Sequence, residues 1–361
     1  MLPTTLLLPI VLLLHARTIS ITPCDASAGL PKFSAILVFG DSVVDSGNNN
    51  YYTPVWAINR ADHPPYGRGF PGQIPTGRFS NGKLVPDFLA SSLGIKETVP
   101  PFLDQNLSDK DIKTGVSFAS GGSGYDNLTA VKTGAIPMLN QVEYFKKYIE
   151  RLKGIVGEKE AKEIIKTALV VISAGSNDFI INFYDSPLRG TQFNISEYQD
   201  FIIQRFQSFV KELLEFGCKT VIVSGIPPIG CLPLRIAAKF KIHRTCLDDE
   251  NSDAQSYNQK LEKLLPQLQA SVQGSRLIYF DVFDPLLDMI THRERYGFVE
   301  TNRGCCGTGF FEAGSLCNLL TPACSNASEF VFWDSVHPTE STYKYIHDCL
   351  LKLIFSKLMT H

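Results

Sequence analysis

Two segments near opposite ends of the chain carry side chains that together could activate a serine hydroxyl. Asp334 stands three residues before His337, and among the seven histidines only His337 has an aspartate at this spacing. A carboxylate in that position can hold the Nδ1 proton of the imidazole within one loop and leave Nε2 to deprotonate a serine. Ser42 follows the apolar run 35–39 near the other end of the chain. These residues indicate the chemistry of a serine esterase.

A serine esterase also needs uncharged donors for the oxyanion of its tetrahedral intermediate. Two segments could supply them, Gly121-Gly122 and Gly175-Ser176-Asn177-Asp178. Glycine lets a substrate carbonyl approach the backbone N–H closely, and an asparagine amide is a neutral side-chain donor. Loss of one such donor typically raises the barrier by roughly 3 to 4 kcal/mol, so we expect these segments to lie near the serine.

The elements that must bring these segments together are short apolar strands alternating with amphipathic helices. Continuous rather than alternating hydrophobicity is typical of parallel strands that are covered on both faces. The expected strands are residues 35–39, 169–172, 220–224 and 277–282, and the expected helices are residues 141–153, 196–216, 254–271 and 341–358. This order predicts a doubly wound α/β sheet. Ligands of such sheets bind beyond the carboxyl ends of the strands, which is where the candidate residues fall.

Four blocks of the sequence resemble, in order, those of the GDSL-type (SGNH) hydrolases. They are residues 39–42 (FGDS), 118–122 (FASGG), 175–178 (GSND) and 334–337 (DSVH). Three further blocks are similar to the plant secreted esterase/lipase branch of that family, namely residues 45–50 (DSGNNN), 75–82 (PTGRFSNG) and 305–309 (CCGTG). The resemblance therefore covers nearly all of the chain beyond its first residues, and the ordered set is far more specific than any single block.

The resemblance implies an α/β fold, a flavodoxin-like three-layer α/β/α sandwich with a mainly parallel sheet. It also implies an acyl-enzyme mechanism with Ser42 as nucleophile, His337 as base and Asp334 as its orienting carboxylate. The oxyanion hole would consist of the backbone N–H groups of Ser42 and Gly122 and the side chain of Asn177. This mechanism requires no cofactor and no metal ion.

The chain departs from the family pattern at two positions. Val43 replaces the leucine of the name motif, a side chain that packs rather than reacts, and Ser117 stands where many relatives carry asparagine. Two further carboxylates, Asp41 and Asp178, are expected to support or cap neighbouring groups, because the mechanism already has its acid.

The first residues of the chain have the pattern of a secretory signal peptide. The run Leu6 to Leu14 consists mostly of leucine, isoleucine and valine; it is too short to cross a bilayer but suits a signal h-region. We predict a signal peptide within residues 1–28, cleaved between residues 20 and 28, and a single hydrolase domain over residues 29–361. The alternative is a buried N-terminal helix. No later stretch is long and apolar enough to span a membrane.

Cysteines and glycosylation sequons agree with passage through the secretory route. Nine cysteines favour two or three disulfides over a metal site, with Cys231 to Cys246 a natural local loop, and the odd count leaves at least one thiol free, Cys24 or Cys218. Four asparagines stand in Asn-x-Ser/Thr sequons, namely Asn106, Asn127, Asn194 and Asn326. We therefore predict a secreted, extracellular glycoprotein, which in a plant would reach the cell wall or apoplast.

Charge and motifs exclude several other classes of function. The formal net charge is −2 and the charged residues are evenly mixed, which leaves no basic face for nucleic acid and no polybasic patch for a membrane. Asp45-Ser46-Gly47 matches an aspartic-protease signature, but there is no second copy to share a proton. Gly77 to Leu84 lacks the hydroxyl of a phosphate loop, and neither G-x-S-x-G nor H-E-x-x-H occurs.

The first hypothesis is thus a serine esterase acting on a neutral ester: a lipid, a cutin-like polyester or an acetylated wall polysaccharide. Acyl transfer to an alcohol would use the same residues. A secreted binding glycoprotein that keeps the sandwich without catalysis is the second hypothesis. The segment 48–106, rich in Pro, Gly, Asn and aromatic residues, is interpreted as an extended loop region that either shapes a substrate cleft or packs as a surface excursion. The sequence predicts no oligomeric state.

Overall fold

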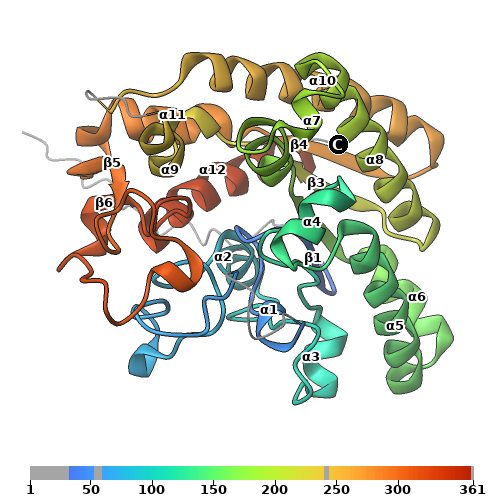
Figure 1. The fold of residues 1–361 in the computed structure, drawn as a ribbon. Helices are drawn as coiled ribbons and strands as arrows, with labels where there is room; N and C mark the ends of the chain where they lie inside the picture. The colour runs from blue at the N-terminus through green and yellow to red at the C-terminus, as the bar shows by residue number, and fades with distance from the viewer. Residues whose placement is uncertain (1–31, 53–58, 240–243, 359–361) are drawn as a thin grey trace, which may run out of the picture.

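A parallel four-stranded sheet forms the centre of the molecule (Figure 1). The computed structural model describes residues 32–52, 59–239 and 244–358, so the predicted signal peptide lies outside the described residues. The strands pair in chain order, and every pairing is parallel: β1 (Ile36–Gly40), β2 (Leu169–Ser173), β3 (Thr220–Ser224) and β4 (Arg276–Phe280). The four predicted strands are confirmed within two residues at each end.

The other edge of β1 is also paired, although the partner is too irregular to count as a strand. Val38 N donates to Val116 O at 3.1 Å, and Phe118 N donates to Val38 O at 2.7 Å, so residues 116–118 run parallel to β1. The chain therefore passes from β1 to a neighbour on one side and then returns to β2 on the other side. In open α/β sheets such a reversal marks the place where ligands bind.

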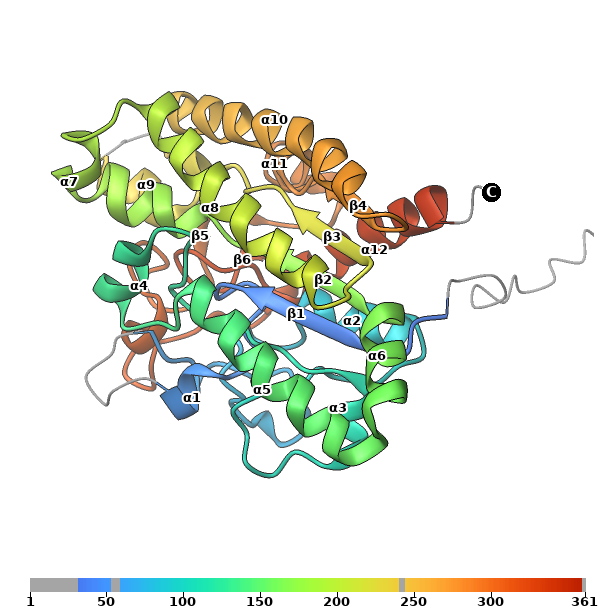
Figure 2. The ribbon, with the colours of Figure 1, turned by 90° about the vertical axis from the view of Figure 1, so that its right-hand side faces the viewer.

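Helices cover both faces of the sheet (Figure 2). One layer contains α5 (Met138–Val156), α8 (Ile195–Glu215) and α10 (Asp248–Ser271), and the opposite layer contains α2 (Val85–Ser92), α11 (Phe283–Thr291) and α12 (Glu340–Leu358). The predicted three-layer α/β/α sandwich is confirmed. The remaining α-helices are short or peripheral: α1 (Asn49–Tyr52), α3 (Asp109–Thr114), α4 (Asn127–Thr133), α6 (Glu158–Thr167), α7 (Pro187–Gly190) and α9 (Pro233–Ala238).

Helix α8 illustrates why the sequence folds into these layers. Asn194 caps its start, since the Asn194 side chain accepts from Glu197 N at 3.0 Å while the Glu197 carboxylate accepts from Asn194 N. Such a capping box satisfies backbone donors that a helix leaves unpaired. Apolar residues then recur every three or four positions, including Ile202, Phe206 and Phe209, and all are buried. This stripe faces the sheet and the polar face meets water.

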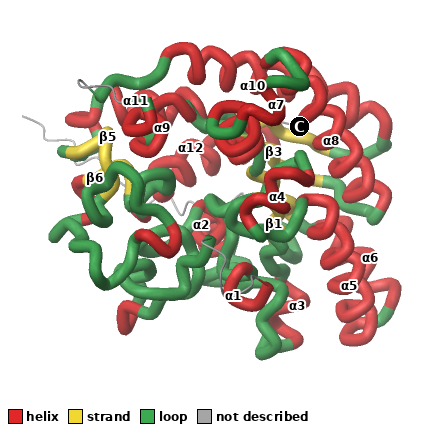
Figure 3. The backbone as a smooth tube through the Cα atoms, viewed as in Figure 1, coloured by secondary structure: helices red, strands yellow, loops and turns green. Residues whose placement is uncertain are grey.

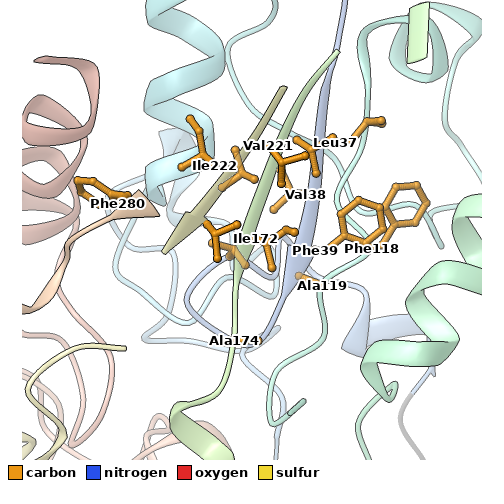
Figure 4. Packing of buried hydrophobic residues seen from close by; sticks show 14 of the residues in the cluster. Leu37, Val38, Phe39, Phe118, Ala119, Ile172, Ala174, Val221, Ile222 and Phe280 are labelled. Carbon is orange, nitrogen blue, oxygen red and sulfur yellow. The ribbon is translucent and has the colours of Figure 1, made fainter. Parts of the chain in front are cut away.

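Aromatic rings fill the core between β1 and this helix layer. Phe39 stacks on Phe118 with ring centroids 4.9 Å apart and meets Phe145 and Phe209 edge-on. Figure 4 shows Phe39 and Phe118 side by side next to β1, while Ile222 and Phe280 lie away from them. Successive residues of a strand point to opposite faces of the sheet. A continuous apolar run therefore makes both faces of the strand apolar, as the sequence predicts.

The segment 48–106 is more ordered than the interpretation as an extended loop region implies. Long loops do gather beside α1 and α2 (Figure 3), but residues 85–92 form helix α2. Pro86 lies in its first turn, and Asp87 Oδ2 accepts from Leu84 N at 2.9 Å, so the helix has its start signal. A second small sheet of β5 (Glu300–Gly304) and β6 (Phe330–Phe332) was also missed; β6 leads directly into the segment that carries Asp334.

The described residues contain three disulfides, which is within the predicted range of two or three. Cys231 pairs with Cys246 as expected, and two further bridges, Cys305–Cys324 and Cys306–Cys317, staple one loop that follows β5. Among the described cysteines, Cys218 and Cys349 are unpaired, and Cys24 lies outside the described residues. Within the part of the chain that the structure describes, no helix is long and apolar enough to cross a bilayer.

We expect the Cys305–Cys324 bridge to contribute about 3 kcal/mol to the free energy of unfolding, because it closes a loop with a sequence separation of 19 residues. The double variant Cys305→Ser/Cys324→Ser should show this loss in urea unfolding followed by circular dichroism. Cys349→Ser, which removes an unpaired thiol on α12, is the control and should change stability by less than about 0.5 kcal/mol. A double variant as stable as the wild type would contradict the prediction.

Candidate active site

The structure brings Ser42, His337 and Asp334 into one chain of hydrogen bonds. His337 Nε2 lies 2.8 Å from Ser42 Oγ, and His337 Nδ1 lies 2.7 Å from Asp334 Oδ2. All three are buried, with relative exposures of 7% for Ser42, 5% for His337 and 0% for Asp334. With Nδ1 as donor to the carboxylate, Nε2 is left as an acceptor for the serine proton, which is the arrangement of an activated nucleophile.

Backbone geometry at the end of β1 places Ser42. Gly40 has φ of 144°, and a Cβ at this position would stand 1.9 Å from the carbonyl oxygen of Ser173, so only glycine lets β1 end this close to β2. The chain then turns sharply, and Asp41 N donates to Ser173 O at 3.0 Å. Ser42 therefore stands at the carboxyl end of β1, next to the end of β2.

Asp334 accepts hydrogen bonds from several donors at once. Its Oδ1 accepts from Val336 N at 2.8 Å and from His337 N at 2.7 Å, and its Oδ2 accepts from the hydroxyl of Tyr66 at 2.7 Å as well as facing His337. Burial and the charge of Asp334 raise the pKa of Tyr66 well above its usual value, so the phenol stays protonated and donates. The Tyr66 oxygen in turn accepts from Gly314 N at 2.8 Å.

The imidazole is also held by packing. Phe79 lies against the His337 ring with centroids 4.8 Å apart, and Trp333 N donates to His337 O at 2.7 Å. Phe79 belongs to the block 75–82, whose Arg78 forms a buried bidentate ion pair with Asp87 of α2, with both N···O distances at 2.8 Å. This block therefore helps to position the ring, and its arginine is engaged in an ion pair within the protein.

Three candidate oxyanion donors follow three neighbouring chain segments, at the edge of the sheet where the chain changes from one side of β1 to the other. Ser42 follows β1, Gly122 follows the segment 116–118, and Asn177 follows β2. Among the described residues, no acceptor is found for the backbone N–H of Ser42 or of Gly122, whereas Asn177 Nδ2 donates to Ser123 O at 2.9 Å. The amide of Asn177 is thus oriented by the loop that carries Gly122.

The block 45–50 braces the Gly122 loop. Asp45 Oδ2 accepts from Gly121 N at 2.9 Å, and Asn48 Nδ2 donates to Ser117 O and Ala119 O, both at 2.8 Å. Ser117, the residue that departs from the family pattern, donates through its hydroxyl to Val44 O at 3.1 Å. The segment 44–48 therefore holds this loop at several points, and Asp45 serves as an acceptor for backbone N–H groups.

Gln141 is a positioning residue that the sequence reasoning missed. Its Oε1 accepts from Gly40 N at 2.9 Å, and its Nε2 donates to Gly40 O at 2.8 Å, so one buried side chain from α5 satisfies both polar groups of Gly40. Gln141 is the only glutamine of α5, but a single polar residue does not form a periodic pattern. The only signal is a polar residue at a position of the apolar stripe, since Val142, Phe145 and Tyr148 bury the same face.

Asp178 also fills the supporting role expected of it. Its carboxylate accepts from Tyr125 N at 2.9 Å, from Asp126 N at 3.1 Å and from the Thr129 hydroxyl, so it ties the end of β2 to the Gly122 loop. Asp41 accepts from Val43 N at 3.2 Å. Burial raises the pKa of Asp41 and of Asp178 to about 7 and that of Asp45 to about 6. In the described chain, no group of three or more His, Cys, Asp or Glu side chains gathers as a metal site.

Comparison with known proteins identifies relatives along nearly the whole chain. The family model described as GDSL-like Lipase/Acylhydrolase matches residues 36–350. The chain is 54% identical to GDSL esterase/lipase At2g31550 of Arabidopsis thaliana over 353 residues, which covers 96% of this chain and 98% of that relative. It is 48% identical to GDSL esterase/lipase At1g06990 of the same plant over 346 residues, 95% of this chain and 94% of the relative.

We expect Gln141→Leu to lower the free energy of unfolding by about 1 to 3 kcal/mol, because it leaves the buried N–H of Gly40 unpaired, while Gly40 O keeps the hydrogen bond from Ser120 N. Urea unfolding measures the loss. Asn140→Leu, the exposed neighbour on the same helix, should change stability by less than about 0.5 kcal/mol. Equal stabilities of the two variants would contradict the assigned role.

The raised carboxyl pKa values predict that stability falls as pH rises from 5 to 8. The native state keeps Asp41, Asp45 and Asp178 protonated up to about pH 6 to 7, whereas in the unfolded chain they ionise near pH 3.9. The native state therefore binds more protons in this window, and the free energy of unfolding drops by about 1 kcal/mol or more per pH unit. Two groups oppose this trend toward the upper end of the window: His347, whose pKa burial lowers, and Lys96, whose pKa burial lowers to about 8.

Urea unfolding at pH 5, 6, 7 and 8 tests the trend. In Asp178→Asn the loss of one titrating carboxyl should make the decline shallower, whatever the stability of that variant at any one pH. Stability that is constant or increases from pH 5 to pH 8 would show that these carboxyls are ionised in the folded protein.

Proposed function

Because the chain belongs to the GDSL-like lipase/acylhydrolase family, a family of carboxylic ester hydrolases, we propose that it cleaves esters through an acyl-enzyme formed on Ser42. Ser42 Oγ attacks the ester carbonyl carbon as His337 Nε2 takes the hydroxyl proton. The tetrahedral intermediate then collapses, and the alcohol leaves with the proton from His337. Water repeats the sequence on the acyl-enzyme and releases the carboxylic acid and free Ser42.

The observation that carries this proposal is the hydrogen-bond chain from Asp334 through His337 to Ser42. Asp334 stabilises the imidazolium that forms during attack and keeps the ring oriented. The oxyanion would accept hydrogen bonds from the backbone N–H groups of Ser42 and Gly122 and from the amide of Asn177. The lack of internal acceptors for the two backbone groups, among the described residues, supports this role.

The proposed substrate is a neutral ester, and the proposed location is extracellular. Three disulfides favour an oxidising compartment. The four sequon asparagines, Asn106, Asn127, Asn194 and Asn326, are all exposed on the surface, so oligosaccharides would fit there without unfolding the chain. In a plant, such a protein would act on lipids, polyesters or acylated polysaccharides of the cell wall or apoplast.

Substitution of the nucleophile tests the proposal. Ser42→Ala should lower kcat/KM for p-nitrophenyl butyrate by at least about a thousandfold, because no other group can form the acyl-enzyme. A fluorophosphonate should label the wild type at Ser42 and leave the variant unlabelled. Ser46→Ala is the matched control: Ser46 is a buried neighbour whose hydroxyl has no partner among the described residues, and its removal should preserve both labelling and turnover.

Two outcomes would change the assignment. Turnover that survives Ser42→Ala would show that Ser42 is not the nucleophile. A folded wild type that neither hydrolyses esters nor reacts with the fluorophosphonate would favour the non-catalytic binding glycoprotein. If the wild type is labelled but added glycerol diverts most of the acyl group into glyceride, then the enzyme is an acyltransferase that uses the same residues.

A further inference from the structure

A narrow cavity of about 90 Å³ extends from the candidate site into the molecule, between the sheet and the layer of α2, α11 and α12. Ser42 and Asn177 line it at one end. Farther in, its walls are side chains of the sheet and of two helices, among them Val171, Ile222, Phe280, Leu286, Ile346 and Leu350. The cavity thus connects the serine hydroxyl with an apolar interior.

The polarity of the lining changes along the strands. On β2 the lining residues are Ser173 at the carboxyl end and Val171 two residues before it, and on β3 they are Ser224 and Ile222. Residues two apart share a face and are about 7 Å apart along the strand, so the wall changes from hydroxyl to hydrocarbon over that distance. The polar end is the end that contains Ser42.

Helix α12 forms the opposite wall over a similar depth. Tyr343, Ile346 and Leu350 lie on one stripe of the helix and all line the cavity. At 1.5 Å per residue this stripe is about 10 Å long. Next along the same stripe, Ile354 is fully buried but does not line the cavity, which therefore ends between Leu350 and Ile354.

We propose that this cavity binds the aliphatic acyl chain of the ester, so that the preferred substrates are esters of medium-length fatty acids rather than acetate esters. The inference rests on the proposed function of Ser42. With the carbonyl at Ser42 Oγ, the chain lies along β3 and α12, and the alcohol remains outside. Each methylene buried there would favour binding roughly fourfold, whereas an acetyl group would leave the cavity empty. An acetylated polysaccharide has no group that fits a hydrocarbon wall.

The test compares kcat/KM for p-nitrophenyl acetate and octanoate in variants of one position on α12. Ile346→Phe narrows the cavity and should lower the octanoate-to-acetate ratio at least about tenfold, whereas Ile346→Ala widens it and should shift the preference toward decanoate or dodecanoate. Opposite shifts at one position are not produced by a general loss of stability. Ile354→Phe, a buried change on the same stripe outside the cavity, should leave the ratio unaltered.

The outcomes separate this inference from the proposed function. If hydrolysis of acetate depends on Ser42 but the ratio does not change in either Ile346 variant, the cavity is not the acyl site and the esterase assignment stands. If no ester is hydrolysed, calorimetric titration with decanoate tests whether the cavity binds a fatty-acyl chain. Binding to the wild type that is lost in Ile346→Phe supports a fatty-acyl cavity, and no binding to the wild type overturns it.

Discussion

Pairing of β1 on both edges is the constraint on which the rest of the site depends. Because residues 116–118 lie on one edge and β2 on the other, three chain segments end at the same place, and short turns bring Ser42, Gly122 and Asn177 together. Gln141 fixes the last residue of β1 by pairing both polar groups of Gly40. A shift of β1 by one residue would turn its side chains to the opposite faces and move Ser42 away from its neighbours.

The carboxylate and the imidazole of the hydrogen-bond chain come from a different structural unit and are held by different contacts. Asp334 lies in the loop between β6 and α12. Its buried carboxylate accepts hydrogen bonds from Tyr66, Val336 and His337, and these offset the free-energy cost of removing it from water. Tyr66 links this carboxylate to Gly314, in the loop that two disulfides staple. The unit that presents the imidazole is thus cross-linked by two disulfides and by the Tyr66 hydroxyl, and the sheet presents the serine to it.

Local patterns explain how much of this could be predicted. Asp334 and His337 lie within one loop, so their pairing could be predicted from their spacing in the sequence. The four strands of the main sheet could be predicted because continuous apolar runs indicate strands covered on both faces. Tyr66 and Gln141 could not, since their partners lie 268 and 101 residues away and no periodicity marks them. The irregular edge at 116–118 and the small β5–β6 sheet were missed for the same reason, as pairing across long separations leaves little trace in a short window.

The separation of 295 residues between Ser42 and His337 has a consequence for biosynthesis. The hydroxyl is synthesised 295 residues before its imidazole partner, and the loop that carries the imidazole leads into α12. A nascent chain that has not reached His337, or one that terminates before it, therefore holds only half of the hydrogen-bond chain, so the proposed ester cleavage cannot begin before this residue is synthesised.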